Sequence, residues 1–126
     1  MKFDKISTIL IWSEDYKALA DWYQTTFNLK VAETIIHPND TGIRFEFPEG
    51  GVWLWIGQHS GIHGKNKDGA RIMFNMNVAS VREAFKYLKD KGVTVIAEPF
   101  KAPTFDKYFA TFTDPDGNYF QIIGLK

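Results

Sequence analysis

The chain has 126 residues, of which 44% are hydrophobic and 16% aromatic, and its 15 Lys and Arg residues balance its 15 Asp and Glu residues. A chain of this length buries about two thirds of its unfolded surface, so we expect one compact domain that needs no structural metal or disulfide. Balanced charge without a basic run argues against nucleic-acid binding, and the lack of cysteine excludes thiolate nucleophiles and cysteine-ligated metals. With no apolar run near the ~20 residues of a membrane span, the expectation is a soluble cytoplasmic protein with no membrane partner.

The first part of the chain predicts a strand and then a helix. Ile6 to Trp12 is rich in β-branched and large apolar residues, which is typical of a strand. Asp15 can cap a helix that ends near Asn28. Its apolar positions recur at spacings of three and four, as a half-buried helix requires: Leu19, Trp22, Tyr23 and Phe27.

The same pattern returns 65 residues later, where Ser80 takes the place of Asp15. Ile72 to Val78 is strand-like, and Ser80 with Glu83 forms a capping box. The second helix should end at Gly92, a favourable residue just beyond a helix C-terminus. Its apolar stripe consists of Val81, Ala84, Phe85 and Leu88.

The two halves also match near their ends. FPEGGVWLWIG (47–57) lies over DPDGNYFQIIG (114–124) without a gap, and each contains a Pro-Glu/Asp-Gly turn suited to a hairpin. The sequence therefore predicts an α+β fold of two tandem βαβββ modules, 1–57 and 70–126, joined by a linker at 58–69. Because one face of each sheet lacks a helix, we expect the modules to pair into a curved, cup-shaped mixed sheet with the helices outside, enclosing a small-molecule site.

This pattern resembles the vicinal oxygen chelate superfamily, which includes glyoxalase I, bleomycin-resistance proteins and extradiol dioxygenases. S-E-D-(x)6-W-Y (13–23) is similar to the family's motif at the first helix, and F-T-D-P-D-G-N-Y-F-Q (112–121) to its last turn. The resemblance covers essentially the full chain. It implies a homodimer and, in the enzymatic members, one divalent metal held by His, Gln or Glu from four strand positions.

Carried over to this sequence, those four positions fall on Thr8, Leu54, Met73 and Gln121. They offer no carboxylate or imidazole to compensate a divalent charge. A shift of one residue, which moves every side chain to the other face of its strand, does not supply one either. We therefore expect no metal and no cofactor.

Alternation along the strands predicts which other side chains line the cup. Trp12 should share the face of Thr8, whereas Trp53 and Trp55 should pack under a helix. The predicted ligand-binding residues are Thr8, Leu10, Trp12, Leu54, Arg71, Met73, Asn75, Tyr119 and Gln121, with Ile6, Val52 and Ile123 completing the lining.

The remaining ionisable residues leave alternatives open. His59 and His63 lie in a glycine-containing loop, and His37 in a turn, so exposed loop positions explain them better than a metal site. Glu46, Glu98 and Arg44 fall in predicted strands and can face either the cup or solvent.

The sequence thus predicts a metal-free protein that binds an apolar or aromatic small molecule and has no catalytic residues, because the lining lacks a paired acid and base, an activated nucleophile and a Lewis acid. Two alternatives remain. One is a metal-dependent glyoxalase-, lyase- or dioxygenase-type enzyme with ligands elsewhere, and the other is a structural or regulatory domain with a vestigial cup.

Overall fold

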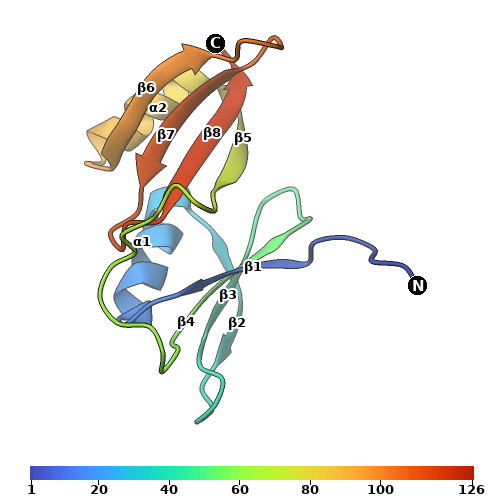
Figure 1. Cartoon of the computed structure of the whole chain (residues 1–126), viewed down its shortest axis with the longest axis vertical. Coiled ribbons are helices and arrows are strands. Elements are labelled where there is room, and N and C mark those ends of the chain that lie inside the picture. Colours follow the sequence, from blue (N-terminus) through green and yellow to red (C-terminus); the bar gives the residue numbers. More distant parts are fainter. The chain divides into compact units, whose positions relative to one another are not determined.

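The computed structural model describes all 126 residues as two units, Met1–Gly64 and Lys65–Lys126 (Figure 1). Each unit contains one helix and one four-stranded mixed sheet in the order βαβββ. The predicted α+β class and the repeated module are therefore confirmed. Neither helix is long and apolar enough to cross a lipid bilayer.

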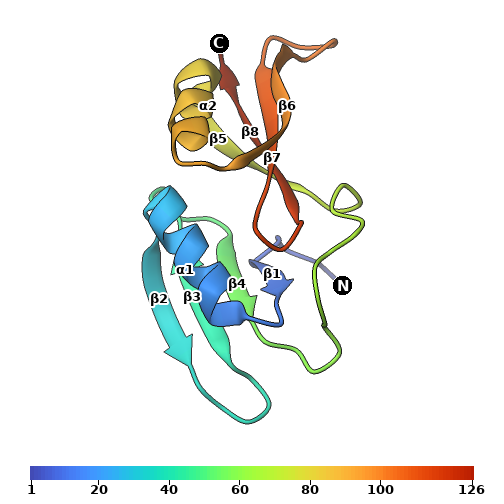
Figure 2. The same ribbon diagram turned by 90° about the vertical axis from the view of Figure 1, so that its left-hand side faces the viewer.

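The first unit consists of β1 (Thr8–Trp12), α1 (Tyr16–Phe27), β2 (Lys30–Ile35), β3 (Gly42–Glu46) and β4 (Trp53–Gly57). Its strands lie in the order β1-β4-β3-β2. The first strand runs parallel to β4, while the other pairs are antiparallel. In Figure 2, α1 lies across one face of this sheet, so the other face is left without a helix from its own unit.

The second unit repeats this topology with β5 (Phe74–Ser80), α2 (Val81–Asp90), β6 (Thr94–Lys101), β7 (Tyr108–Thr113) and β8 (Tyr119–Leu125). The strand order is β5-β8-β7-β6, and β5 is parallel to β8. The internal repeat in the sequence therefore corresponds to a repeat of the fold.

Both helices begin and end where the capping residues predict. Asp15 Oδ1 accepts a hydrogen bond from the Ala18 amide at 3.3 Å, and Ser80 Oγ accepts one from the Glu83 amide at 3.3 Å. Asn28 caps the end of α1 at a φ of 52°, and Gly92 follows α2 at a φ of 84°. Since a left-handed residue closes a helix C-terminus, these two residues stop the chain from continuing as helix.

Each unit has its own apolar core between helix and sheet. In the first, Leu54 and Ile56 of β4 and Leu19 and Tyr23 of α1 are almost fully buried. In the second, Phe112 and Phe120 are fully buried with ring centroids 5.5 Å apart, and Phe85 of α2 lies 5.8 Å from Phe112. Such aromatic burial is a large stabilising term for a small unit.

The register of β4 differs from the prediction. Thr8 lies opposite Trp53, and Ile9 lies opposite Leu54, so Leu54 points to the helix side of the sheet. Its side chain is 1% exposed, whereas Trp53 is 40% exposed. The predictions that Leu54 shares the face of Thr8 and that Trp53 and Trp55 pack under a helix are therefore wrong.

An extra turn residue explains the error. The hairpin before β4 contains two glycines with positive φ, Gly50 at 73° and Gly51 at 84°, while the corresponding turn before β8 contains only Gly117, at 87°. Overlaying the two segments without a gap ignores this insertion and shifts β4 by one residue. Because side chains alternate along a strand, one residue exchanges its two faces. The structural counterpart of Gln121 is Trp55.

Candidate functional site

The face of the first sheet away from α1 is lined by indole rings. Trp53 and Trp55 on β4 lie opposite Thr8 and Leu10 on β1, and Trp12 lies opposite Gly57. Leu10 is 56% exposed and Trp53 is 40% exposed. We call this surface the tryptophan face, defined by Thr8, Leu10, Trp12, Trp53 and Trp55.

Two glycines make room for the Trp55 ring. A Cβ atom on Gly42 would lie 2.5 Å from Trp55 Cζ2, and one on Gly57 would collide with Trp55 Nε1. Both glycines are strand neighbours on the same face, so the indole lies across their bare backbone. The Trp12 ring meets Trp55 edge to face at 6.5 Å. The glycines thus allow the Trp55 ring, which is 6% exposed, to lie buried beside Trp12.

Gly42→Ala should therefore disturb the tryptophan face directly. The added methyl would meet both the Trp55 ring and the Ile56 carbonyl oxygen, 2.6 Å away, so the ring must move. We expect a loss of about 1–3 kcal/mol in the free energy of unfolding, with a changed near-ultraviolet circular dichroism signal. Gly61→Ala, whose Cβ meets only the His59 ring at 3.3 Å, is the control. Unchanged stability and spectrum in Gly42→Ala would contradict this packing.

The guanidinium group of Arg44 is the only cation that contacts these indoles. Arg44 lies opposite Trp55 on β3, with its Cζ 4.4 Å from the centre of the Trp53 ring, and its Nη2 donates to Glu33 Oε2 at 2.6 Å. Arg44 and its strand neighbour Trp55 each have a buried donor without a hydrogen-bond acceptor, Arg44 Nε and Trp55 Nε1. Unpaired buried donors are rare in folded proteins.

The face of the second sheet away from α2 carries several polar side chains. Asn75 lies opposite Gln121, and the Gln121 side chain donates from Nε2 to Thr111 Oγ1 at 2.9 Å. Tyr119 lies two residues before Gln121 on β8 and shares its face. This surface offers neutral amide and hydroxyl groups to a ligand.

The structure thus groups the predicted residues by unit. Thr8, Leu10 and Trp12 lie together in the first unit, and Asn75, Tyr119 and Gln121 in the second. Met73 and Arg71 precede β5, and Arg71 is 77% exposed, with its Nε 2.5 Å from Asp68 Oδ2. Sequence reasoning missed Trp53 and Trp55, although the Gly50-Gly51 pair was a signal of the insertion that shifts them.

The donor set does not fit a divalent metal. With the corrected register, the four strand positions that the resemblance assigns to metal ligands carry the hydroxyl of Thr8, the indole of Trp55, the thioether of Met73 and the amide of Gln121. None bears a negative charge, and an indole is not a metal ligand of this kind. No cluster of three or more His, Asp or Glu residues suited to a metal occurs in the chain.

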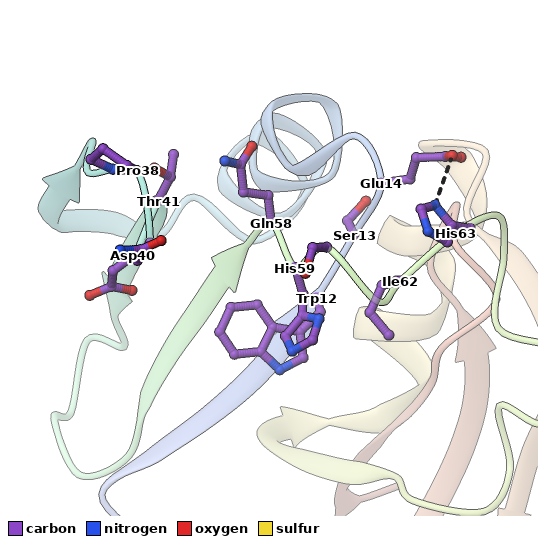
Figure 3. A pocket seen from close by; sticks show the side chains of 12 residues that line it. Trp12, Ser13, Glu14, Pro38, Asp40, Thr41, Gln58, His59, Ile62 and His63 are labelled. Carbon is purple, nitrogen blue, oxygen red and sulfur yellow. Dashed lines mark ion pairs between the residues drawn. The ribbon is translucent and has the colours of Figure 1, made fainter.

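A pocket of about 560 Å³ adjoins Trp12 at one end of the first sheet (Figure 3). Three segments form it: the end of β1 and its continuation to Glu14, the loop between β2 and β3, and the segment after β4. Figure 3 shows Trp12 and His59 between the wall that carries Asp40 and the wall that carries Glu14. The lining consists of Trp12, Ser13, Glu14, Pro38, Asn39, Asp40, Thr41, Gln58, His59, Ser60, Ile62 and His63.

Hydrogen bonds hold these segments together. The Ser13 amide donates to the Gly57 carbonyl at 2.9 Å, and the Gln58 amide donates to the Thr41 carbonyl at 3.0 Å. His59 Nδ1 accepts from the Gly61 amide at 2.9 Å, and the His59 ring lies 5.4 Å from the ring of Trp12. The two predicted loop histidines therefore line the same pocket without forming a metal cluster.

Comparison with solved structures shows the fold. A member of the glyoxalase/bleomycin resistance protein/dioxygenase superfamily from Sphaerobacter thermophilus has a TM-score of 0.80 at 20% identity, over 97% of this chain and 98% of that chain. The antibiotic binding protein TnmS3 from Streptomyces sp. CB03234 has a TM-score of 0.78 at 16% identity, over 100% and 99%. The fosfomycin resistance protein FosX from Listeria monocytogenes has a TM-score of 0.64 at 15% identity, over 100% and 95%.

A search of curated protein sequences found no match. The family model of the Glyoxalase/Bleomycin resistance protein/Dioxygenase superfamily, in contrast, matches residues 5–122, which is nearly the whole chain. This match agrees with the repeated βαβββ module and with the two motifs noted in the sequence. The chain therefore belongs to the glyoxalase/bleomycin resistance protein/dioxygenase superfamily.

Proposed function

We propose that this protein binds an aromatic or apolar small molecule against the tryptophan face, without a metal. The observation that carries the proposal is the concentration of Trp12, Trp53 and Trp55 on one sheet face, with Trp53 and Leu10 substantially exposed. Exposed apolar surface costs stability in water, and contiguous patches of it mark sites of interaction. Indole rings provide flat surfaces for stacking on a planar ligand.

The polar groups on the helix-free faces of the two sheets, each taken within its own unit, support binding and recognition rather than chemistry. Asn75 and Gln121 on the second sheet are neutral hydrogen-bonding groups, and Arg44 on the first is already paired with Glu33. No serine or threonine of the two faces is paired with a histidine that would activate it as a nucleophile. We infer that the predicted residues Thr8, Leu10 and Trp12 contact the ligand, and that Leu54 supports the sheet from behind. For Asn75, Tyr119 and Gln121, on the sheet face of the second unit, ligand contact stays a prediction.

Two structural relatives are consistent with this reading, since one is named an antibiotic binding protein and another a fosfomycin resistance protein. Their low identity shows a common fold only, and fold alone does not determine function. The proposal therefore depends on the indole-lined face of this chain. The homodimeric assembly and the cytoplasmic location expected earlier belong to the same proposal.

A ligand screen read at the indole N–H resonances tests the proposal. The four tryptophans give four indole signals in a ¹H–¹⁵N spectrum, which single Trp→Phe variants assign. A library of planar aromatic compounds should yield ligands that raise the melting temperature and shift the signals of Trp12, Trp53 and Trp55. Because stacking aromatics dominate such contacts, Trp53→Ala should weaken a ligand found this way by about tenfold.

Trp22 of α1 supplies the matched control, since its ring packs against Tyr23 and Phe27 on its own helix, 4.9 Å and 5.7 Å between centroids. Trp22→Phe should leave the affinity unchanged. A screen without any shift on the tryptophan face would contradict the proposal. Stoichiometric metal in protein purified without chelator, with a higher melting temperature on adding Zn²⁺, Ni²⁺, Mn²⁺ or Fe²⁺, would contradict its metal-free part.

A further inference from the structure

We infer that the pocket beside Trp12 binds a positively charged amine, so that the ligand of this protein is an organic cation with an aromatic body. The inference rests on the proposed function for the aromatic part of the ligand, because Trp12 belongs both to the tryptophan face and to the pocket. The charged part of the ligand is inferred from the residues that line the pocket. The sequence, with zero net charge, does not suggest such a preference.

The charge of the lining favours a cation. Among the twelve residues that line the pocket, Glu14 and Asp40 carry carboxylates, and none is a lysine or arginine. Both acidic side chains belong to exposed residues, so a ligand can reach them. Because field lines concentrate in a concave site, carboxylates there attract a cation more strongly than on a flat surface.

The aromatic rings of the pocket favour the same chemistry. Trp12 lies between the wall with Asp40 and the wall with Glu14, and His59 stands edge to face against its indole at 5.4 Å (Figure 3). An ammonium group is attracted to the negative face of an indole, the most favourable aromatic partner for a cation. The pocket thus offers an organic cation an aromatic face at Trp12 and acidic groups at Asp40 and Glu14 in the same lining.

The walls are also preformed. Glu14 Oε2 accepts from the Gly64 amide at 3.2 Å, and its Oε1 lies 3.8 Å from His63 Nδ1, so this carboxylate is held at the pocket wall. On the other wall, Thr41 Oγ1 donates to the His37 carbonyl at 2.6 Å and accepts from the His37 amide at 3.1 Å, which closes the loop that carries Asp40. A ligand therefore loses little free energy to ordering the site.

The size of the pocket suits a small organic molecule. Its volume of about 560 Å³ lies within the roughly 300–1,000 Å³ typical of ligand pockets. A free inorganic cation would leave most of this space filled with water. An amine attached to an aromatic ring can instead occupy both the acidic wall and the indole surface.

Three probes of similar size and different charge test the inference: phenethylamine, 2-phenylethanol and phenylacetate. Their phenyl rings match, while their polar ends are cationic, neutral and anionic at neutral pH. Titration of the full chain, followed at the Trp12 indole resonance, should show the amine binding about fivefold or more tighter than the alcohol, and phenylacetate weakest. The preference of the amine over the alcohol should shrink as salt is added.

Matched variants locate the charge effect. Glu14→Gln and Asp40→Asn should each weaken the amine about twofold to fivefold and leave the alcohol unchanged. Glu49→Gln and Asp21→Asn, which neutralise exposed carboxylates outside the pocket on the same unit, should change neither probe. Glutamine at position 14 keeps an oxygen that can accept from Gly64, so the loop should remain attached.

The outcomes separate this inference from the proposed function. Equal binding of amine and alcohol at Trp12 would overturn the cation preference and leave the aromatic surface intact. Binding of the amine that shifts only Trp53 and Trp55, or that Glu49→Gln weakens as much as Glu14→Gln does, would overturn the pocket assignment. Absence of any Trp12 shift with all three probes overturns the inference, whereas the proposed function fails only if the wider aromatic screen also leaves the tryptophan face unchanged.

Discussion

Leu54→Ala should lower the free energy of unfolding by about 2–5 kcal/mol, because it removes a side chain from the core between α1 and the first sheet. Leu54 is 1% exposed, and Ile56, two residues further along β4 on the same face, is fully buried. Trp53→Ala, one residue away, should cost only about 1 kcal/mol, since Trp53 is 40% exposed and its loss removes a partly hydrated contact with Arg44. Chemical denaturation monitored by far-ultraviolet circular dichroism gives both values.

The pair tests the register of β4. If Leu54 lined the ligand surface and Trp53 lay under the helix, as the ungapped repeat predicts, the order of the two effects would be reversed. Leu54→Ala should also leave binding of aromatic ligands nearly intact in the folded fraction, whereas Trp53→Ala should weaken it. A larger loss of stability in Trp53→Ala than in Leu54→Ala would therefore contradict the corrected register.

Asp114→Ala should lower the free energy of unfolding by about 2–4 kcal/mol, because it removes the acceptor that closes the turn before β8. Asp114 is 3% exposed, and its Oδ1 accepts from the amides of Asp116 and Asn118, both at 2.9 Å. The Asn118 side chain donates to Oδ2 at 3.0 Å. Alanine leaves these partly buried donors without their carboxylate acceptor, which costs more than losing a fully exposed hydrogen bond.

The same variant should loosen a second segment. The Asn66 amide donates to the Asp116 carbonyl at 2.7 Å, and its side chain donates to Asn118 Oδ1 at 2.9 Å, so the end of the connection between the units, at 65–69, is fastened to this turn. Hydrogen exchange at Asn66 should therefore be faster in Asp114→Ala. Asp106→Ala, at an exposed position of the β6–β7 hairpin, should change neither stability nor exchange. Slow exchange at Asn66 in a destabilised Asp114→Ala would show that the turn does not hold this segment.

Much of the fold could be read from the sequence because its signals are local. Asp15, Ser80 and Gly92 mark helix ends through hydrogen bonds and backbone angles that involve only a few neighbouring residues. The 65-residue repeat then carries the topology of one unit over to the other. These features suffice for two βαβββ modules, and the family match agrees with them.

The strand faces that carry the candidate site residues were predicted only in part. Thr8, Leu10 and Trp12 were placed correctly on one face because they lie close in sequence to the Asp15 cap. Side chains alternate between the two faces along β1, so a count from Asp15 determines the face of each. Leu54 was misplaced because its position was counted through a turn whose length differs between the modules. The pocket beside Trp12 could not be predicted at all, since it joins Glu14, Asp40 and His59 from segments far apart in the chain.

The sequence by itself determined the number of modules, their helix boundaries and the scarcity of metal-ligating side chains at the strand positions of the family, because composition and short-range capping need no knowledge of distant contacts. Only the tertiary structure decided which of Leu54 and Trp55 faces away from the helix, and that two acidic residues line the same pocket as an indole. Strand register and loop proximity depend on pairing between distant segments, and a single extra glycine in a turn is enough to reverse the outcome.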